Sequence, residues 1–330
     1  MAEKHWQPSV NNKTFVERAR MLKNIRAFFD GRNVLEVETP LLSHYATTDP
    51  HIDSFRSRFR EQTCYLNTSP EYAMKRLLAD NPQAIYQICK AFRDDELGSH
   101  HNPEFTLLEW YRPNYDMRQL MNELVQLVET IFEYSIIQPN IQPKFEYLSY
   151  QKAFEKNLGF NPHKITAKEC YQFSLDNKIE IPQGLTANDN VNDWLDWLLT
   201  QQVLSAFNKQ KFTFLYDYPA AQCSLAKIEN NIEQIAVAKR FELFYGDVEL
   251  ANGFFELTDG DEQLQRFQQE NQQRKQTGKE AIAIDENLIA ALKHGLPNCA
   301  GVAVGLDRLL MVLTKAANIE QVLSFSWNRA

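Results

Sequence analysis

The stretch from residue 92 to residue 112, FRDDELGSHHNPEFTLLEWYR, constrains this chain most, because a charged loop there separates two apolar runs. Ile85 to Phe92 and Phe105 to Tyr111 have the composition of strands, so the order predicts an antiparallel hairpin with a long functional loop. Arg93 at the mouth of the loop would hold a phosphate through its forked guanidinium, and Phe105 would offer a flat face to a base. The alternative is a surface hairpin whose charges are only solvated.

A long helix followed by a strand is predicted at the N-terminus. Apolar residues recur there at helical spacing, at Phe15, Ala19, Leu22, Ile25 and Phe29. Residues 30–33, DGRN, interrupt the pattern, and residues 34–40, VLEVETP, then alternate as a strand that ends at a proline.

A short strand and a helix are predicted near the C-terminus. Residues 301–305, GVAVG, form an apolar run whose glycines permit close approach, and Leu306 to Thr314 follow as an apolar helix. Arg308 lies in the first turn of that helix, where a cation is unfavourable. Its position therefore indicates a bound anion or a base on which it stacks.

A second hairpin is predicted over residues 241–250, FELFYGDVEL, with a Gly-Asp turn. It would bring Glu242 and Glu249 to one site, and their oxygens suit Mg²⁺. Activation of a carboxylate by ATP brings like charges together, so it also needs fixed cations such as Arg93 and Arg308. The alternative is that both carboxylates are solvated strand residues.

Composition limits the class of protein. The chain of 330 residues is 44% hydrophobic, enough for a large core, and no run approaches the roughly 18 apolar residues of a membrane span. Its five cysteines are widely spaced, without a CxxC pair, and residues 1–9 are polar, which together predict a cytoplasmic protein with reduced thiols and no structural zinc. The net charge of −8 gives no overall basic footprint for a nucleic acid.

Two segments are expected to be accessory. The pattern loosens between residues 161 and 208, which predicts a small helical insertion. Trp194 and Trp197 would pack one helix face of it against the main domain, with protein docking as the alternative. Residues 263–279, QLQRFQQENQQRKQTGK, predict a highly polar helix with a solvated face.

In their order and separation, the first hairpin, the N-terminal unit and the C-terminal unit resemble the three signature motifs of class II aminoacyl-tRNA synthetases. HNPEFTLLEWY, ELANGFFELTD and AGVAVGLDR are similar in particular to the lysyl-tRNA synthetase branch. The resemblance implies a catalytic domain over residues 14–330 with an α+β fold, an antiparallel sheet flanked by helices. It also implies a homodimer formed through the first motif.

Only residues 1–13 precede the first motif, too few for the anticodon-binding barrel of roughly a hundred residues that lysyl-tRNA synthetases carry. We therefore expect no N-terminal anticodon-binding barrel and no tRNA binding. The architecture resembles the branch of ligases that activate (R)-β-lysine as an adenylate, using ATP and Mg²⁺, and transfer it to a lysine ε-amine of elongation factor P. The alternatives are a shortened enzyme that passes α-lysine to tRNA or a small molecule, and a catalytically inactive regulatory binding protein.

Three substitutions support the ligase branch. Lysyl-tRNA synthetases typically read APE, EIGNG and GLGIG where this chain has residues 69–71, SPE, 249–253, ELANG, and 302–305, VAVG. An added methyl at Ala251 or Ala303 would discriminate between amino acids by roughly 1 to 3 kcal/mol. The alternative is neutral drift in packing.

The resemblance also implies a role for individual residues. The expected ATP-binding residues are Arg93, Asp94, Asp95, His101, Asn102, Phe105, Glu249, Leu250, Gly305 and Arg308, of which Arg93 and Arg308 are catalytic. The expected substrate-binding residues are Ser69, Pro70, Glu71, Glu109, Tyr111, Asn252, Glu256 and Ala303, and the expected magnesium ligands are Glu242 and Glu249.

Within that set, the acids would recognise the ammonium groups of the substrate. Glu71 is expected near the amino group closest to the carboxyl end, and Glu109 with Glu256 near the distal ammonium, because a buried carboxylate stays charged only beside a partner. Adenine would lie between Phe105 and Arg308. One departure is that Asp94-Asp95 follows Arg93 where the family usually has Asn-Glu, which should weaken ATP binding unless a cation compensates.

Overall fold

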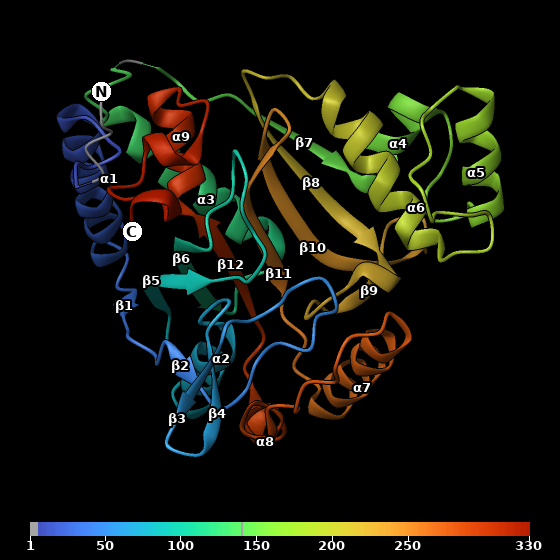
Figure 1. Ribbon diagram of the computed structural model, residues 1–330, viewed down its shortest axis with the longest axis horizontal. Coiled ribbons are helices and arrows are strands. Elements are labelled where there is room, and N and C mark those ends of the chain that lie inside the picture. Colours follow the sequence, from blue (N-terminus) through green and yellow to red (C-terminus); the bar gives the residue numbers. More distant parts are fainter. Residues whose placement is uncertain (1–5, 140) are drawn as a thin grey trace. The chain divides into compact units, whose positions relative to one another are not determined.

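The computed structural model describes residues 6–139 and 141–330 (Figure 1). These residues form two compact units, one made of the chain up to residue 143 together with residues 255–330, and the other of residues 144–254. The catalytic domain over residues 14–330 and the helical insertion over residues 161–208 remain predictions.

The first unit contains a sheet and a small three-stranded ribbon. In the sheet the strand order is β1 (Leu35–Glu36), β5 (Ile85–Phe92), β6 (Glu104–Pro113) and β12 (Cys299–Gly305). In the ribbon the order is β2 (Leu42–Ser43), β4 (Gln62–Leu66) and β3 (Arg56–Phe59). β5 and β6 pair antiparallel from Ile85↔Tyr111 to Phe92↔Glu104, which confirms the predicted hairpin.

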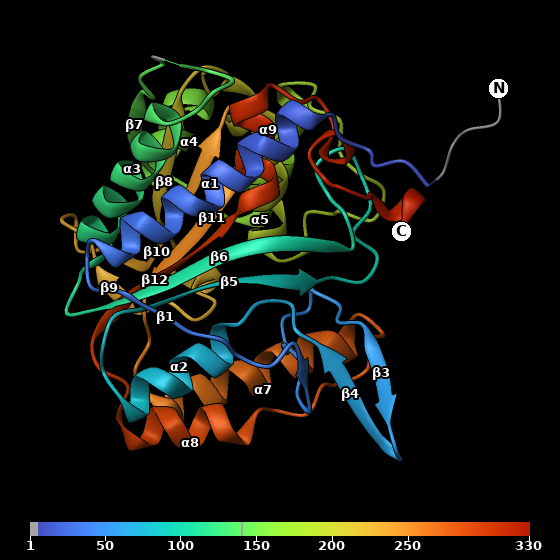
Figure 2. The ribbon, with the colours of Figure 1, turned by 90° about the vertical axis from the view of Figure 1, so that its left-hand side faces the viewer.

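In Figure 2 the α-helices of this unit lie on both sides of β5 and β6. They are α1 (Asn12–Asp30), α2 (Glu71–Asp80), α3 (Met117–Glu133), α7 (Gly260–Gln276), α8 (Glu286–Gly295) and α9 (Leu306–Thr314), with 3₁₀ turns at Ile319–Gln321 and Trp327–Arg329. α1 packs on α3, and Figure 2 shows α8 beside α2, with α2, α7 and α8 together on one side of β5 and β6. α9 has the bounds that the apolar pattern predicted.

Long-range contacts of Phe29 and Asp307 attach the N-terminal and C-terminal helices to the β5–β6 hairpin. Phe29 of α1 stacks on Tyr86 with ring centroids 4.5 Å apart and meets Trp110 edge-on at 5.3 Å. The buried Asp307 of α9 accepts a 2.7 Å hydrogen bond from the backbone N–H of Thr106 and another of 2.7 Å from Arg18. These contacts place the first turn of α9, and Arg308 with it, beside the hairpin.

The prediction of a strand over residues 34–40 was wrong in length, because β1 comprises only Leu35–Glu36. The N–H groups of Leu35 and Val37 donate to the carbonyls of Ala84 and Tyr86, parallel to β5. Pro40 has no N–H with which to extend such pairing.

The second unit is a sheet with helices packed on it. Its strand order is β11 (Val248–Phe255), β10 (Ala236–Tyr245), β8 (Phe212–Pro219) and β7 (Phe145–Ser149), with β9 (Ile228–Asn230) on β10. Its helices are α4 (Tyr150–Leu158), α5 (Ala167–Asp176) and α6 (Val191–Leu198), followed by a π turn at Leu199–Val203 and 3₁₀ turns at Leu204–Ala206 and Ala220–Gln222. The pairing Tyr245↔Val248 confirms the second predicted hairpin.

Helices α5 and α6 lie between residues 161 and 208, and both tryptophans pack into the apolar core of the second unit. Trp194 is fully buried with Tyr150, Phe154 and Cys170, and its indole N–H donates to the carbonyl of Thr186 at 2.9 Å. Trp197 packs against the same cluster. α5 and α6 are therefore joined to α4 and β8 through one apolar core.

Trp194→Ala should destabilise the second unit by about 3 to 5 kcal/mol, since a large buried side chain is lost and the cavity cannot fully collapse. Urea unfolding followed by circular dichroism measures this. Leu175→Ala is the control, because Leu175 is 49% exposed on α5 and its truncation should cost under about 0.5 kcal/mol. Equal losses for both variants would contradict the packing role of Trp194.

The polar helix expected over residues 263–279 is α7, and it is less solvated than its composition indicates. Gln263, Phe267 and Arg274 of α7 are buried. None of the helices described in residues 6–139 and 141–330 is long and apolar enough to span a membrane. All five cysteines are free thiols.

Candidate active site

Strand β6 of the β5–β6 hairpin carries two of the expected substrate-binding residues, Glu109 and Tyr111. β12 pairs antiparallel with the other edge of β6, with Gly301 opposite Tyr111 and Ala303 opposite Glu109. Residues directly opposite each other point to the same face of a sheet, as do residues two apart on one strand. Glu109, Tyr111 and Ala303 therefore share one face.

The three acids predicted to bind ammonium groups come together, but around a lysine that sequence reasoning missed. Lys75, only 1% exposed, lies 2.8 Å from a carboxylate oxygen of Glu71 and 2.6 Å from one of Glu256. Glu109 interacts electrostatically with all three of these side chains. We call Glu71, Glu109, Glu256 and Lys75 the carboxylate cluster.

Within the carboxylate cluster, Glu109 keeps an oxygen unused. One oxygen accepts a 2.7 Å hydrogen bond from the Tyr111 hydroxyl, and the other has no hydrogen-bond partner in the described part of the chain although Glu109 is only 2% exposed. Burial, with Glu71 nearby, raises the pKa of Glu109 above the usual carboxyl range. Such a group gains most from a cationic ligand.

Glycine at position 301 is required for this arrangement. A Cβ there would lie 2.3 Å from the ring of Tyr111 and 2.6 Å from a carboxylate oxygen of Glu256, distances at which atoms overlap. The predicted close approach at this glycine is therefore confirmed, and it lets β12 pass directly behind Tyr111 and Glu256.

Ser69 and Pro70 introduce α2. Pro70 is the residue before the first turn of α2, and the Ser69 hydroxyl accepts from the backbone N–H of Glu71 at 3.3 Å. Both residues fix where the helix begins, and hence where Glu71 and Lys75 project.

The predicted phosphate-binding groups meet at the loop between β5 and β6. Arg93 lies over the Phe105 ring, 5.2 Å from guanidinium carbon to ring centroid, and its Nε is buried with no hydrogen-bond partner among the described residues. Its Nη1 is 3.4 Å from Glu96. In this structure Arg93 itself faces Phe105, the ring that the family resemblance assigns to adenine, so the guanidinium and the ring form one surface.

Arg308 and His101 form the other half of this group. Arg308 Nε donates to the carbonyl of His100 at 3.2 Å, and its Nη2 is 2.6 Å from His101 Nε2. Burial and the Arg308 charge lower the pKa of His101, so the imidazole is neutral and accepts from the guanidinium at neutral pH. Gly305 precedes the first turn of α9 and thereby Arg308.

Asn102 is placed for a structural task. Its amide donates to the carbonyl of Glu104 at 2.6 Å, and its oxygen accepts from the N–H of Trp327 at 3.1 Å. These bonds attach the loop to the C-terminal turn, so the described contacts of Asn102 are with protein backbone.

The Asp94-Asp95 pair, a departure from the family pattern, has a local explanation. The Asp94 carboxylate accepts the backbone N–H of Asp95 at 2.9 Å, and Asp95 has a φ of 61°, in the left-handed region. Asn and Asp are the side chains best suited to such a turn. Asp94 therefore retains the acceptor that an asparagine would provide.

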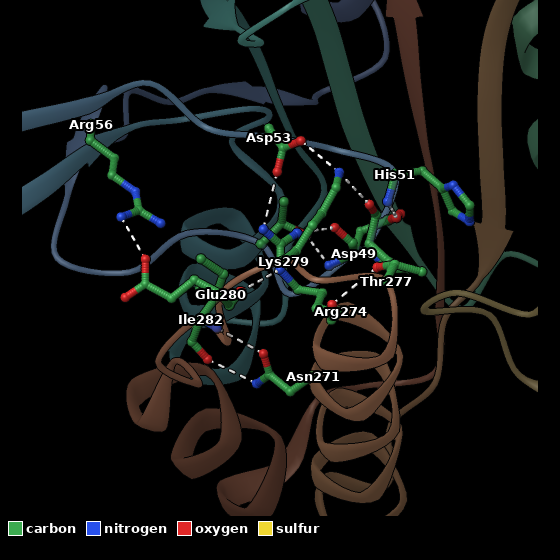
Figure 3. A network of polar contacts seen from close by, with 12 residues as sticks. Asp49, His51, Asp53, Arg56, Asn271, Arg274, Thr277, Lys279, Glu280 and Ile282 are labelled. Atoms are coloured by element: carbon green, nitrogen blue, oxygen red, sulfur yellow. Dashed lines mark hydrogen bonds and ion pairs between the residues drawn. The ribbon is translucent and has the colours of Figure 1, made fainter.

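Figure 3 shows a polar network around Asp53, Arg274 and Lys279. Asp53 accepts from Arg274 at 3.0 Å and from Lys279 at 2.7 Å, and its backbone carbonyl accepts the N–H of Asp94 at 2.8 Å. The Lys279 ammonium and, more weakly, Arg274 hold the pKa of Asp53 below its ordinary value. The end of α7 is thus linked to the residue that follows Arg93.

The two predicted magnesium ligands lie in the second unit. Glu242 accepts a 2.6 Å hydrogen bond from Tyr218 and an ion-paired one from Arg240, which also donates to Asn252 at 3.2 Å. Burial raises the pKa of Glu242, and the charge of Glu249 adds to the rise. Leu250 is the extra residue of a β-bulge, since Phe244 pairs with Glu249 and Leu243 with Ala251.

The carboxylates of Glu242 and Glu249 are suited to a magnesium ion. The described residues contain no group of three or more His, Cys, Asp and Glu side chains that could hold a metal. Mg²⁺ bound with a nucleotide commonly uses one or two carboxylates and takes its remaining ligands from water and phosphate oxygens. Two mutually repelling carboxylates on adjacent strands satisfy that requirement.

Arg240 and Lys75 are the charged residues that sequence reasoning missed here. Each had a local signal, because Lys75 lies one helical turn after Glu71 and Arg240 two strand residues before Glu242. Neither spacing indicates that the side chain is buried. Lys75 can be buried because it pairs with Glu256, which is distant in the sequence.

Comparison with known proteins shows the family to which the chain belongs. A family model described as tRNA synthetases class II (D, K and N) matches residues 5–329. The chain belongs to this family of class II tRNA synthetases. Among curated relatives, elongation factor P--(R)-beta-lysine ligase of Pseudoalteromonas translucida (strain TAC 125) is 45% identical over 332 residues, covering 98% of each chain. The protein of the same name from Salmonella paratyphi B (strain ATCC BAA-1250 / SPB7) is 43% identical over 331 residues, again covering 98% of each chain.

Proposed function

We propose that this protein is a ligase that activates (R)-β-lysine with ATP and transfers it to the ε-amino group of a lysine on elongation factor P. The shared name of relatives that match along 98% of the chain supports the substrates. The observation that carries the chemistry is the carboxylate cluster, in which the buried Glu109 keeps an oxygen without a partner in the described residues.

In the first step a carboxylate oxygen of the amino acid attacks the α-phosphorus of ATP. A P–O bond forms to the amino acid, the P–O bond to pyrophosphate breaks, and an aminoacyl adenylate results. Arg93 would hold the α-phosphate, because guanidinium forms two parallel hydrogen bonds to phosphate oxygens and keeps its proton. Arg308 and Phe105 would hold the nucleotide, and His101 in its neutral form orients Arg308.

Glu242 and Glu249 would hold Mg²⁺, which neutralises phosphate charge when bound. Arg240 hydrogen-bonds both Glu242 and Asn252, one of the expected substrate-binding residues, so an expected magnesium ligand and an expected substrate ligand are held by the same guanidinium.

The carboxylate cluster would bind the two ammonium groups of the amino acid. Ala303, opposite Glu109, adds a methyl group on the face where the substrate is expected. In the second step the acceptor ε-amine attacks the acyl carbon, the bond to AMP breaks, and the amine loses a proton as the amide forms. The mechanism needs no covalent bond to the enzyme.

We further propose that the enzyme acts as a cytoplasmic homodimer. Phe15 and Val16 on α1 are exposed apolar residues of the first motif, 36% and 42% exposed. The free thiols, buried or half-buried, agree with a reducing compartment.

The test is amino-acid-dependent exchange of pyrophosphate into ATP, comparing (R)-β-lysine with α-lysine, followed by mass spectrometry of elongation factor P incubated with enzyme, ATP and (R)-β-lysine. We expect a higher kcat/KM for (R)-β-lysine and one added lysyl group on the factor. A preference for α-lysine together with an unmodified factor would show that the protein uses another substrate and acceptor.

A further inference from the structure

Lys75 is a buried cation with two acidic partners. It projects from α2, is 1% exposed, and contacts Glu71 on its own helix and Glu256 after β11. A buried ammonium is costly unless it is paired, so these contacts must persist in the folded protein. Both partners raise the pKa of Lys75 against the effect of burial, which keeps it charged.

The charges around Lys75 do not balance. Three carboxylates, Glu71, Glu109 and Glu256, face one ammonium. Tyr111 and the thiols of Cys89 and Cys299 also interact here, and burial raises their pKa values, so they are neutral at neutral pH. Two further groups interact with Glu71: Tyr72, whose pKa burial also raises, and Glu270 of α7, whose pKa burial raises to about 7 and which lies beside Arg266. When all three acids are ionised, two negative charges are left without a cation from the described residues.

The unpaired oxygen of Glu109 shows where a ligand would attach. That oxygen is buried and has no hydrogen-bond partner in the described part of the chain, while its neighbour is held by Tyr111. An ammonium group there would supply both the missing hydrogen bond and one of the missing positive charges.

We propose that Lys75 is a positioning residue that sets the net charge of the carboxylate cluster at −2 when its three acids are ionised, so that the cluster accepts a ligand with two ammonium groups. This inference rests on the proposed function and deepens it, because it assigns part of the specificity for a diamino acid to Lys75. Lys75 also holds one oxygen of Glu71 and one of Glu256, which orients the remaining oxygens.

Removal of Lys75 has a defined consequence. Glu71, which is half-buried, and Glu256, which is buried, would then have no cation between them. A second acid of the cluster should therefore take up a proton in the free protein, besides Glu109, whose pKa burial already raises to about 8. A diammonium ligand must displace this additional proton, so it should bind more weakly than to the unaltered protein at neutral pH, and its binding should improve more steeply as the pH rises.

The first measurement uses the unaltered protein. Calorimetric titration compares (R)-β-lysine and α-lysine, each with two ammonium groups, with 3-aminohexanoate and norleucine, each with one. We expect at least about 100-fold weaker binding of the compounds with one ammonium group, because a site built to pair a polar substrate group can reject an analogue without that group by up to about 10⁴-fold or more. Equal binding of both classes would overturn the proposal.

The second measurement uses Lys75→Met, which keeps the length and removes the charge, and the double variant Glu71→Gln/Lys75→Met, which restores a net charge of −2 when the remaining acids are ionised. Lys75→Met should raise Kd for the diamino acids at least tenfold at pH 7. Its log Kd should fall with pH by about one more per pH unit than that of the unaltered protein, because one additional proton is displaced. The double variant should bind more tightly than Lys75→Met and lose this additional pH dependence.

An unchanged Kd in Lys75→Met, or weaker binding in the double variant than in the single one, would refute the role of Lys75. If Lys75→Met does not fold, a folded double variant that binds diamino acids supports the proposal, and one that fails to bind them refutes it. The two lysine isomers separate this test from the proposed function, since a preference for α-lysine contradicts that function but leaves the charge count supported.

Discussion

Arg93→Ala should lower amino-acid-dependent pyrophosphate exchange by at least about 10³-fold, the effect usual for an arginine that stabilises charge in phosphoryl transfer. The guanidinium lies over the Phe105 ring, and its buried Nε has no hydrogen-bond partner in the described residues. This donor is therefore available to a phosphate oxygen. Most of the loss should be in kcat, because charge on the phosphate increases in the transition state.

Two controls accompany this variant. Arg93→Lys keeps the charge but not the forked geometry and should retain intermediate activity. Arg58→Ala removes an exposed arginine from β3 and should leave exchange unchanged. Exchange by Arg93→Ala within tenfold of the unaltered protein would show that the phosphate site was assigned to the wrong residues.

Glu109→Gln should weaken substrate binding and should make the unliganded protein more stable than the unaltered one as the pH rises. The variant keeps the hydrogen bond with Tyr111 but offers no charge, so the KM for (R)-β-lysine should rise about 100-fold or more. Because the folded protein raises the pKa of Glu109, it binds that proton more tightly than the unfolded chain does. The stabilisation is complete below the ordinary carboxyl pKa and is lost as pH rises through the raised pKa, which is about 8.

The unliganded protein should therefore lose stability relative to Glu109→Gln between about pH 5 and pH 8, by about 1 to 3 kcal/mol. Thermal unfolding at several pH values measures this difference, and addition of (R)-β-lysine should restore stability only to the unaltered protein. Glu104→Gln on the same strand is the control, since the side chain of Glu104 is 51% exposed. A pH profile that is the same for Glu109→Gln and the unaltered protein would contradict the raised pKa.

Most elements near the site were predictable from local pattern. The β5–β6 and β10–β11 hairpins and α9 followed from alternating or helical apolar spacing and from turn residues, each of which acts over a few neighbouring positions. The strand after α1 was overestimated because alternation alone does not supply a hydrogen-bonding partner.

Some side chains of the site were also predictable from local sequence, and others were explained only by the structure. Arg93 and Phe105 were identified from sequence because they lie only twelve positions apart on one hairpin. Asp94 and Asp95 were unexplained until the left-handed turn at Asp95 was visible, since a backbone angle is not written in residue type.

The sequence by itself determined the two hairpins, the helix that carries Arg308 and the acids of the site, because these depend on short-range periodicity and on residue chemistry. Only the tertiary structure decided how the charges are paired. Glu256 is distant in sequence from Lys75, as Asp53 is from Lys279, yet each pair is in contact. The net charge that a ligand meets depends on such long-range pairing, which no local pattern records.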